Sequence, residues 1–288
     1  MRRGLRGMWR ELMDRVGLGW RPEIAAEIFA RLDGIDVVEV IADDYFEAPS
    51  REIRALRTLA AQVPVVLHGV SLGLASTARA DVRRLARMAR LVDRVRPEFW
   101  SEHLAFVRGG GVEIGHLAAP PRTESTVDGA AANFDRARAV VGSAPLVENI
   151  ATLIDPPGSD LDEGEWVRAI LSASGADLLL DLHNLHANAV NFGFDARDFI
   201  RRLPEDRIGA VHLAGGKWIG RLLDDHLHDV PDEVYDLLER TAAHASRPLT
   251  VILERDGNYP PMEELIAQLD RARSALRAGR RARELARV

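Results

Sequence analysis

Short runs of β-branched and apolar residues alternate along the chain with longer segments whose apolar residues recur every three or four positions. The short runs have the length of strands, and their near-continuous apolar character indicates burial on both faces, as in a parallel sheet. Helical spacing is clearest over residues 76–95 and 232–245, and Pro22 is placed to open a helix that ends near residue 32. The pattern predicts eight strands, at residues 16–20, 36–43, 63–70, 98–106, 144–150, 177–184, 207–215 and 249–256.

Eight strands, each followed by a helix, most simply close into a single (β/α)8 TIM barrel of the α/β class over 288 residues. We therefore expect one domain over residues 1–288, with a core at about 16–277 and basic, peripheral termini that are solvated helices or frayed tails. A doubly wound open sheet is the alternative, because strand counts from sequence alone are imprecise. The glycines at 109–111 lack the strand–turn–helix context of a phosphate-binding loop and are expected in an ordinary loop.

Composition narrows the chemistry. Apolar residues make up 47% and charged residues 28% of the chain, as in a globular protein with a sizeable core. The net charge of −6 argues against nucleic acid as the main partner. Because the chain has no cysteine, any metal must be held by His, Asp, Glu, Asn or backbone oxygen. The N-terminus lacks the apolar centre of a signal peptide and no window has the length of a membrane span, so we expect a cytoplasmic protein without a membrane partner.

Metal-competent side chains stand at or just beyond the ends of nearly every predicted strand. In a parallel barrel these ends converge on one face, where TIM-barrel chemistry takes place. The predicted loop after the seventh strand adds a segment rich in carboxylates and imidazoles, with Asp224, Asp225, His226, His228 and Asp229. The strand-end residues are His68, Glu102, His103, Glu148, Asp181, His183, Asn184, His212, Glu254 and Asp256.

Together these side chains predict a metal site. Packed without a cation, the carboxylates would repel one another and raise each other's pKa. Taken singly, each residue has a plainer explanation: a strand-end His is often a hydrogen-bonded packing residue, Glu148 is placed to cap the next helix, and the Asp-rich loop has the composition of a solvated turn. The combination favours more than one ion, because one ion cannot use so many ligands. Nitrogen and oxygen ligation without sulfur suits Fe, Mn or Zn.

Seven segments carry a more specific signal than the strand ends alone: LHGVSLGLAS, SEHLAF, LVENIATL, LLLDLHNLHANAVNFGFD, VHLAGG, LDDHLHDVPDEVYDLL and LERDGNYPPMEEL. They occur in the order seen in the multinuclear non-heme iron-dependent oxidative enzymes, of which the methanobactin biosynthesis oxidase is the best-known type. The chain resembles this family from about residue 17 to 275. More distantly, it resembles the xylose isomerase and endonuclease IV-like TIM barrels.

The resemblance implies an enzyme with two or three irons, in mixed ferrous and ferric states, and O2 as co-substrate. Its substrate would be a cysteine in a ribosomally made precursor peptide, bound to iron through the thiolate. A companion protein usually recognises the leader of that precursor, so a leader-recognising partner is expected. The resemblance implies metal ligation by His68, His103, Glu148, Asp181, Asn184, His212, Asp224, His226 and Glu254.

Two residues depart from the family pattern. The family's HLAGH is HLAGG here, so Gly216 stands where relatives carry an imidazole that contacts substrate or supports a ligand. The family's DVNN is DLHN here, so His183 replaces an Asn. Strand alternation would put Asp181 and His183 on one face, which makes His183 a candidate additional or competing ligand. His186 is expected in the following loop, and Asp195 as the cap of the next helix.

Three other functions compete with the oxidase. The fold also suits an endonuclease IV-like phosphodiesterase with three zincs, or a sugar isomerase or epimerase with one or two divalent ions. A nuclease should carry basic loops at the barrel mouth, whereas the segments SLGLAST, VRGGGVEIGH, LHANAVNFGFD and GNYPPM are poor in basic residues. The third alternative is a non-catalytic, metal-binding partner within a modification complex.

Overall fold

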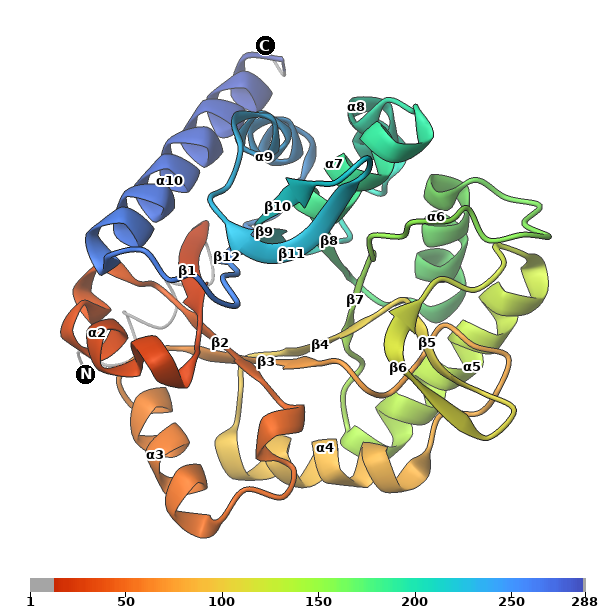
Figure 1. Cartoon of the computed structure of the whole chain (residues 1–288), viewed down its shortest axis with the longest axis horizontal. Coiled ribbons are helices and arrows are strands. Elements are labelled where there is room, and N and C mark those ends of the chain that lie inside the picture. The colour runs from red at the N-terminus through yellow and green to blue at the C-terminus, as the bar shows by residue number, and fades with distance from the viewer. Residues whose placement is uncertain (1–12, 287–288) are drawn as a thin grey trace.

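The eight predicted strands form a closed parallel barrel in the computed structural model, which describes residues 13–286 (Figure 1). The first and last strands pair with each other, with Val16 opposite Val251, so the predicted TIM barrel is confirmed and the open sheet is wrong. In their order around the barrel, the strands are β1 (Arg15–Gly19), β12 (Thr250–Leu253), β9 (Ile208–Leu213), β8 (Leu178–Asp181), β7 (Leu146–Glu148), β4 (Trp100–His103), β3 (Val65–Gly69) and β2 (Val38–Ile41).

Helices surround the barrel and cover its outer surface (Figure 1). Their apolar faces turn inward, as in α4, where Leu85, Met88, Leu91 and Val95 are buried at helical spacing. The helix predicted after Pro22 is broken, with 3-10 turns on both sides of α2. The helices are α2 (Ala25–Ala30), α3 (Ser50–Ala60), α4 (Val82–Val95), α5 (Glu124–Val141), α6 (Glu163–Ser174), α7 (Leu182–Phe192), α8 (Ala196–Arg202), α9 (Asp232–His244) and α10 (Met262–Leu285).

The barrel strands are mostly apolar because both of their faces are covered. Every residue of β3, β8 and β12 is buried, between the barrel interior and the helical layer. A polar residue in such a strand is therefore accommodated most easily near the strand end, at the barrel mouth. His68 lies at the last but one position of β3 and Asp181 at the last position of β8, where the barrel opens.

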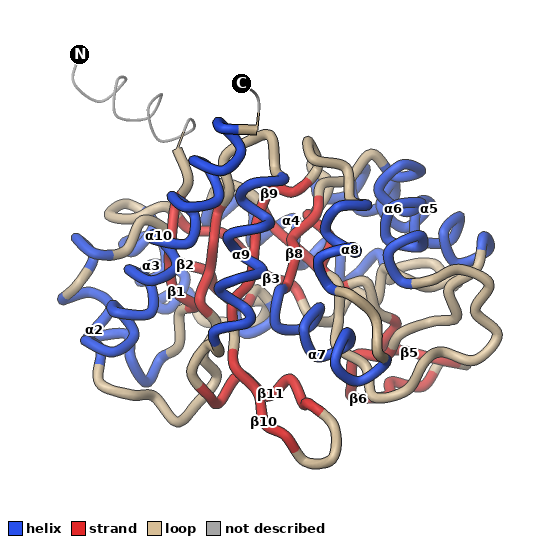
Figure 2. The backbone as a smooth tube through the Cα atoms, turned by 90° about the horizontal axis from the view of Figure 1, so that it is seen from above, coloured by secondary structure: helices blue, strands red, loops and turns tan. Residues whose placement is uncertain are grey.

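Two β-hairpins extend the mouth of the barrel beyond the predicted strands. The first pairs β5 (Phe106–Gly109) with β6 (Val112–Ala118), and the second pairs β10 (Gly215–Trp218) with β11 (Leu222–His228). Figure 2 shows both beyond the same end of the barrel. The sequence predicts loops for most of these residues, because exposed hairpins lack the apolar runs that mark buried strands. The first hairpin turns at Gly110 and Gly111, whose φ angles of 58° and 82° are left-handed.

The strand predicted at residues 177–184 ends early. β8 stops at Asp181, and α7 begins at Leu182 without an intervening loop. The switch occurs because the Asp181 carboxylate caps the helix, with Oδ1 accepting a hydrogen bond from the Asn184 amide at 2.6 Å. His183 and His186 therefore lie on a helix, and the strand-alternation argument for His183 is wrong. The predicted cap of α8 is confirmed, since Asp195 accepts from the Arg197 amide at 2.8 Å.

The basic C-terminal segment is a helix that packs against α9 along one side, whereas residues 284–286 at its end are exposed, as predicted for a solvated helix. Arg280 donates to Asp14 and to the carbonyl oxygens of Ala242 and Ala245 at the end of α9. α10 approaches α9 closely at Gly279, where an added Cβ would lie 2.1 Å from the Glu239 carbonyl oxygen. The basic residues 1–12 and 287–288 lie outside the described residues. None of the helices described over residues 13–286 is long and apolar enough to cross a membrane, and the cytoplasmic location stays a prediction.

Candidate metal centre

The predicted ligands come together at the carboxyl ends of the barrel strands. They arrive from six barrel strands or the residues just after them, and from two segments outside the barrel, α7 and β11. Seven of them are almost completely buried, which removes their carboxylates and imidazoles from water. These seven are His68, His103, Glu148, Asp181, Asn184, His212 and Glu254, whereas Asp224 and His226 are half-buried.

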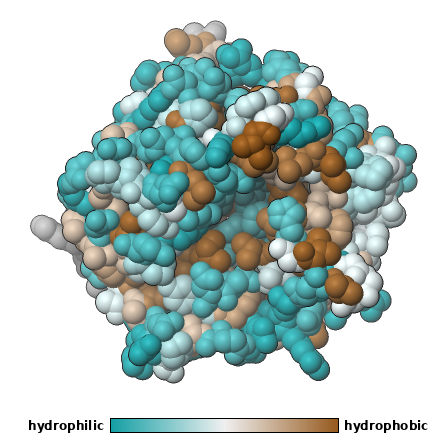
Figure 3. Space-filling model, in the orientation of Figure 1, coloured by the Kyte–Doolittle hydropathy of each residue, from teal (hydrophilic) through white to brown (hydrophobic). Residues whose placement is uncertain are grey.

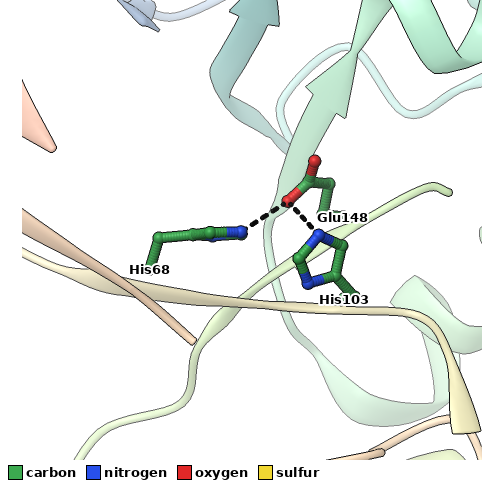
Figure 4. Close-up of side chains that lie close together, drawn as sticks. All are labelled: His68, His103 and Glu148. Carbon is green, nitrogen blue, oxygen red and sulfur yellow. Dashed lines mark ion pairs between the residues drawn. The ribbon is translucent and has the colours of Figure 1, made fainter. Parts of the chain in front are cut away.

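One group of donors is formed by His68, His103 and Glu148. The two imidazoles present Nε2 to the same carboxylate oxygen, and Oε2 of Glu148 lies 3.4 Å from His68 and 3.5 Å from His103. Figure 4 shows the carboxylate facing both rings. All three donor atoms lie within 4.8 Å of one another, the spacing that one metal ion needs.

A second group shares Glu148 and adds Asp181, His212 and Glu254, again with all donor atoms within 4.8 Å. Nδ1 of His212 is the centre of this group. It lies 3.2 Å from Oε1 of Glu148, 3.1 Å from Oε2 of Glu254 and 3.9 Å from Oδ2 of Asp181. The two oxygens of Glu148 thus face different groups, which is the arrangement of a carboxylate that bridges two metal ions.

A third set of donors lies beside the second group, on α7 and the second hairpin. Oδ1 of Asp224 is 2.8 Å from Nε2 of His226 and 2.8 Å from Nδ1 of His183. The amide of Asn184 donates to the Asn149 carbonyl oxygen, which leaves its own Oδ1 without a partner. His226 adopts a left-handed backbone with φ of 54°, a strain of about 1–3 kcal/mol that is characteristic of functional sites.

Each imidazole among the predicted ligands uses one nitrogen for an outer hydrogen bond and turns the other toward the donor groups. Nδ1 of His68 contacts Ser101, and Nδ1 of His103 donates to the Gly69 carbonyl oxygen. Such outer hydrogen bonds fix the tautomer and orientation of metal-binding imidazoles. The other two pairs are His212 Nε2 with Glu39 at 3.0 Å and His226 Nδ1 with Asp256 at 3.2 Å.

Sequence reasoning missed two residues that shape this centre. Glu39 lies inside β2, away from the strand ends, and is fully buried against His212. The single acidic residue within the apolar run VVEVIA was the available signal. Asn149 joins the ends of β7 and β8, since its side chain donates to the Asp181 carbonyl oxygen and accepts from the Asp181 amide, both at 2.9 Å.

The buried polar atoms that lack partners support a fit to metal ions. Among the described residues, nine buried side-chain nitrogen or oxygen atoms have no hydrogen-bond partner, and six of them belong to this centre. Unpaired buried polar atoms are rare, and an ion is one of the few groups that satisfies them. The six are Glu39 Oε1, Glu148 Oε2, Asp181 Oδ2, His183 Nε2, Asn184 Oδ1 and His226 Nε2. Of these, His183 Nε2 lies against Gly216 and is not turned toward the other donors.

Without cations, the centre can hold its charges together only by retaining protons. Burial, together with Asp224 and Glu148, raises the pKa of Asp181 well above its usual range. Burial would lower the pKa of His212, but Glu254 and Glu39 outweigh it and raise that pKa well above the ordinary value. Metal ions would replace these protons as counter-charges, so metal binding releases protons and tightens with rising pH.

The stability of the metal-free protein should fall at alkaline pH. Burial lowers the pKa of His103, but Glu148 and Glu102 outweigh it and raise the pKa from 6.5 to about 9. Because the folded-state pKa lies above the unfolded value, this stabilisation is complete below pH 6.5 and is lost as pH rises through about 9. We expect chelator-treated protein to lose up to about 3 kcal/mol of unfolding free energy from this residue.

Urea unfolding measured across that pH window checks this expectation. His103→Gln is the control, because it should flatten the alkaline loss. A metal-free protein whose stability is unchanged from neutral pH to about pH 10 would contradict the assigned electrostatics.

The mouth above the centre is hollowed and bordered by apolar side chains. Figure 3 shows this face, with a depression at its centre and apolar surface beside it. Large exposed apolar side chains are found on β6, in the loop after β7 and in the turn of the second hairpin: Val112, Ile114, Leu153, Ile154, Trp218 and Ile219. Exposed apolar surface of this kind is typical of an interaction site.

A closed TIM barrel with buried His and carboxylate groups at its mouth is a metal-site architecture, and similarity to known proteins defines it further. The family described as RiPP precursor modification enzyme MbnB/TglH/ChrH matches residues 15–277. The chain therefore belongs to this family, whose members modify precursors of ribosomally made peptides, and the resemblance drawn from the sequence motifs is confirmed.

Individual relatives agree with this assignment. A UPF0276 protein of Streptomyces avermitilis is 41% identical over 275 residues, which are 92% of this chain and 56% of that longer protein. A UPF0276 protein of Rhizorhabdus wittichii is 37% identical over 281 residues, covering 94% of this chain and 97% of its own. Among solved structures, an L-ribulose 3-epimerase matches with a TM-score of 0.61 and 17% identity. The match covers 96% of this chain and 99% of the epimerase chain, and at this identity it shows a shared fold alone.

Proposed function

We propose that this protein is a multinuclear iron, O2-dependent oxidase that modifies a cysteine of a ribosomally made precursor peptide. The observation that carries the proposal is the position of Glu148, which belongs to both donor groups and turns one oxygen toward each. A carboxylate with one oxygen in each donor group is suited to hold two ions. A site for a single divalent ion would need no such shared carboxylate. Family membership supplies the substrate class, a precursor peptide.

The donor groups distribute as three ion positions. The first is held by His68, His103 and Glu148, and the second by Glu148, Asp181, His212 and Glu254. The third is assigned to Asn184, Asp224 and His226, which the family resemblance implies as ligands. When bound, iron would supply O2 activation and a site for the substrate thiolate.

The donor chemistry supports iron. All donors are imidazole nitrogens, carboxylate oxygens or an amide oxygen, a set that suits iron, manganese or zinc better than magnesium or calcium. The amide of Asn184 is a weaker ligand than an imidazole, which suits a position that stays open to exchange. Since the chain has no cysteine, a thiolate at this centre can come only from the substrate, and the enzyme has no thiol of its own to oxidise.

The protein's own residues bind and orient the peptide. The two hairpins and their exposed apolar side chains border the mouth and offer contact area to an extended chain. A peptide substrate therefore accounts for apolar surface that a small sugar would leave unused. A leader-recognising partner, which members of the family usually require, would dock the rest of the precursor.

A sugar epimerase is the main alternative, because this chain shares the fold of the L-ribulose 3-epimerase named above. An endonuclease and a non-catalytic metal-binding partner are further alternatives. The three differ from the oxidase in metal and in chemistry. None of them requires iron, O2 and a thiolate together.

The test combines metal analysis with a spectroscopic titration. The protein is purified aerobically and anaerobically, its metals are measured by elemental analysis, and a Cys-containing peptide is added. We expect at least two irons per chain, a ferric–thiolate absorption band and peptide-dependent O2 uptake. The same peptide with Cys replaced by Ser is the control and should give neither signal. Full zinc occupancy without iron-dependent O2 uptake would refute the oxidase.

A further inference from the structure

His183 is the one imidazole of the centre that the family resemblance does not assign as a ligand. It lies in the first turn of α7, is fully buried, and has its Nδ1 2.8 Å from Oδ1 of Asp224. Because a carboxylate only accepts, Nδ1 is the donor in this hydrogen bond. The same Asp224 oxygen lies 2.8 Å from Nε2 of His226, without hydrogen-bond geometry between them. Asp224 is therefore held between two imidazoles.

The opposite edge of the His183 ring packs against the second hairpin. A Cβ added at Gly216 would lie 2.5 Å from Cε1 and 2.7 Å from Nε2 of His183, and 1.9 Å from the Leu223 carbonyl oxygen. Only glycine leaves room for both the ring and the hairpin backbone. Nε2 therefore faces the backbone of β10, while Nδ1 faces the metal-binding carboxylate. This orientation makes His183 a hydrogen-bond donor to a ligand.

The position of the second hairpin explains why such a donor is needed. Asp224 and His226 lie on β11, which pairs only with β10 and is not part of the barrel. Two hydrogen-bonded contacts tie this hairpin to α7, beside the cation–π contact of Arg221 with Phe192. One is the His183–Asp224 hydrogen bond, and the other is the side chain of Asn191, which donates to the Leu222 carbonyl oxygen and accepts from its amide at 2.9 Å each.

We propose that His183 is the positioning residue of the third ion position, and that its Nδ1–H fixes the Asp224 carboxylate for metal binding. The inference rests on the proposed function, which assigns Asp224 to that position. Hydrogen bonds to a ligating carboxylate typically strengthen metal affinity 10–100-fold. Gly216 contributes by admitting the ring.

Two substitutions separate the hydrogen bond from the volume of the ring. His183→Asn keeps an N–H close to the position of Nδ1 but loses volume, whereas His183→Leu keeps most of the volume and has no donor. His186→Leu is the matched control, since it removes a half-buried imidazole from the same helix outside both donor groups. Iron content and affinity are measured by chelator competition, which needs no catalytic turnover.

We expect the wild-type protein to bind three irons, and His183→Leu to weaken one of them by about 10–100-fold while the two at Glu148 are unchanged. Those two ions report that the variant is folded. His183→Asn should lie within a few-fold of wild type, and His186→Leu should match it. The inference is overturned if His183→Leu retains all three ions at wild-type affinity, or if His183→Asn is as weak as His183→Leu. Wild-type protein that binds two irons also overturns it but leaves the oxidase proposal standing, whereas protein that binds none refutes both.

Discussion

Replacing Glu148 with Gln is expected to empty the two ion positions that this residue joins. Glu148 is the only residue shared by both donor groups, and each of its oxygens faces one of them. The amide keeps the shape of the carboxylate but loses its charge and one acceptor oxygen. We expect the affinity for both ions to fall by more than about 100-fold, because losing a ligand exceeds the 10–100-fold effect of an outer hydrogen bond. The ferric–thiolate band and peptide-dependent O2 uptake should disappear with the metal.

Glu102→Gln is the matched control for this substitution. Glu102 is also a fully buried glutamate at the barrel mouth, but it accepts from the backbone amides of Leu72 and His103 and belongs to neither donor group. Burial raises its pKa, which lessens the cost of replacing the carboxylate by a neutral amide. Elemental analysis should show normal iron in Glu102→Gln. Full iron in Glu148→Gln would contradict the assignment of the site.

Replacing His212 with Ala is expected to cost stability as well as metal. The imidazole is completely buried, with Glu39 on one side and Glu148 and Glu254 on the other. Its removal leaves these carboxylates without their shared counter-charge, and breaking a buried ionic pair in this way typically costs about 3–5 kcal/mol. Urea unfolding of the metal-free protein at neutral pH measures the loss, and elemental analysis should show the second position empty.

Part of that loss should be reversed by a second substitution. Within residues 13–286, His212 is the one side chain that hydrogen-bonds the buried carboxylate of Glu39. Glu39→Leu therefore removes a carboxylate that His212→Ala leaves without its partner. We expect the double variant to be more stable than His212→Ala alone. A His212→Ala protein within about 1 kcal/mol of wild type would show that the carboxylates are neutralised in another way.

The barrel could be predicted from sequence because its strands are buried on both faces. Apolar runs such as those around Val65 and Leu178 predict buried strands of a parallel sheet, and the parallel arrangement brings the strand ends together. Six of the nine predicted ligands lie at the mouth for that reason, and the other three reach it on α7 and β11. The shared role of Glu148 was not predictable, since which oxygen faces which imidazole depends on side-chain packing.

The hairpins and the start of α7 could not be predicted for a different reason. Their residues are exposed or mixed in polarity, so no apolar period marks them. Asp181 is both the last residue of a strand and the cap of a helix. The sequence predicts that the strand continues after Asp181, because nothing in it marks the capping hydrogen bond. The role proposed for His183 depends on this switch, because a helical turn brings its ring to Asp224. Glu39 was overlooked because it sits within a strand instead of at its end.

Anomalous diffraction at the iron edge, from crystals of the iron-loaded protein, tests the central claim most directly. We expect two anomalous peaks about 3.5–4 Å apart on either side of Glu148, and a third peak beside Asp224 and His226. Of the first two, one should lie against His68 and His103, the other against His212 and Glu254, with Glu148 between them. A single peak that Glu148 contacts with both oxygens, or peaks away from this carboxylate, would contradict a multinuclear centre.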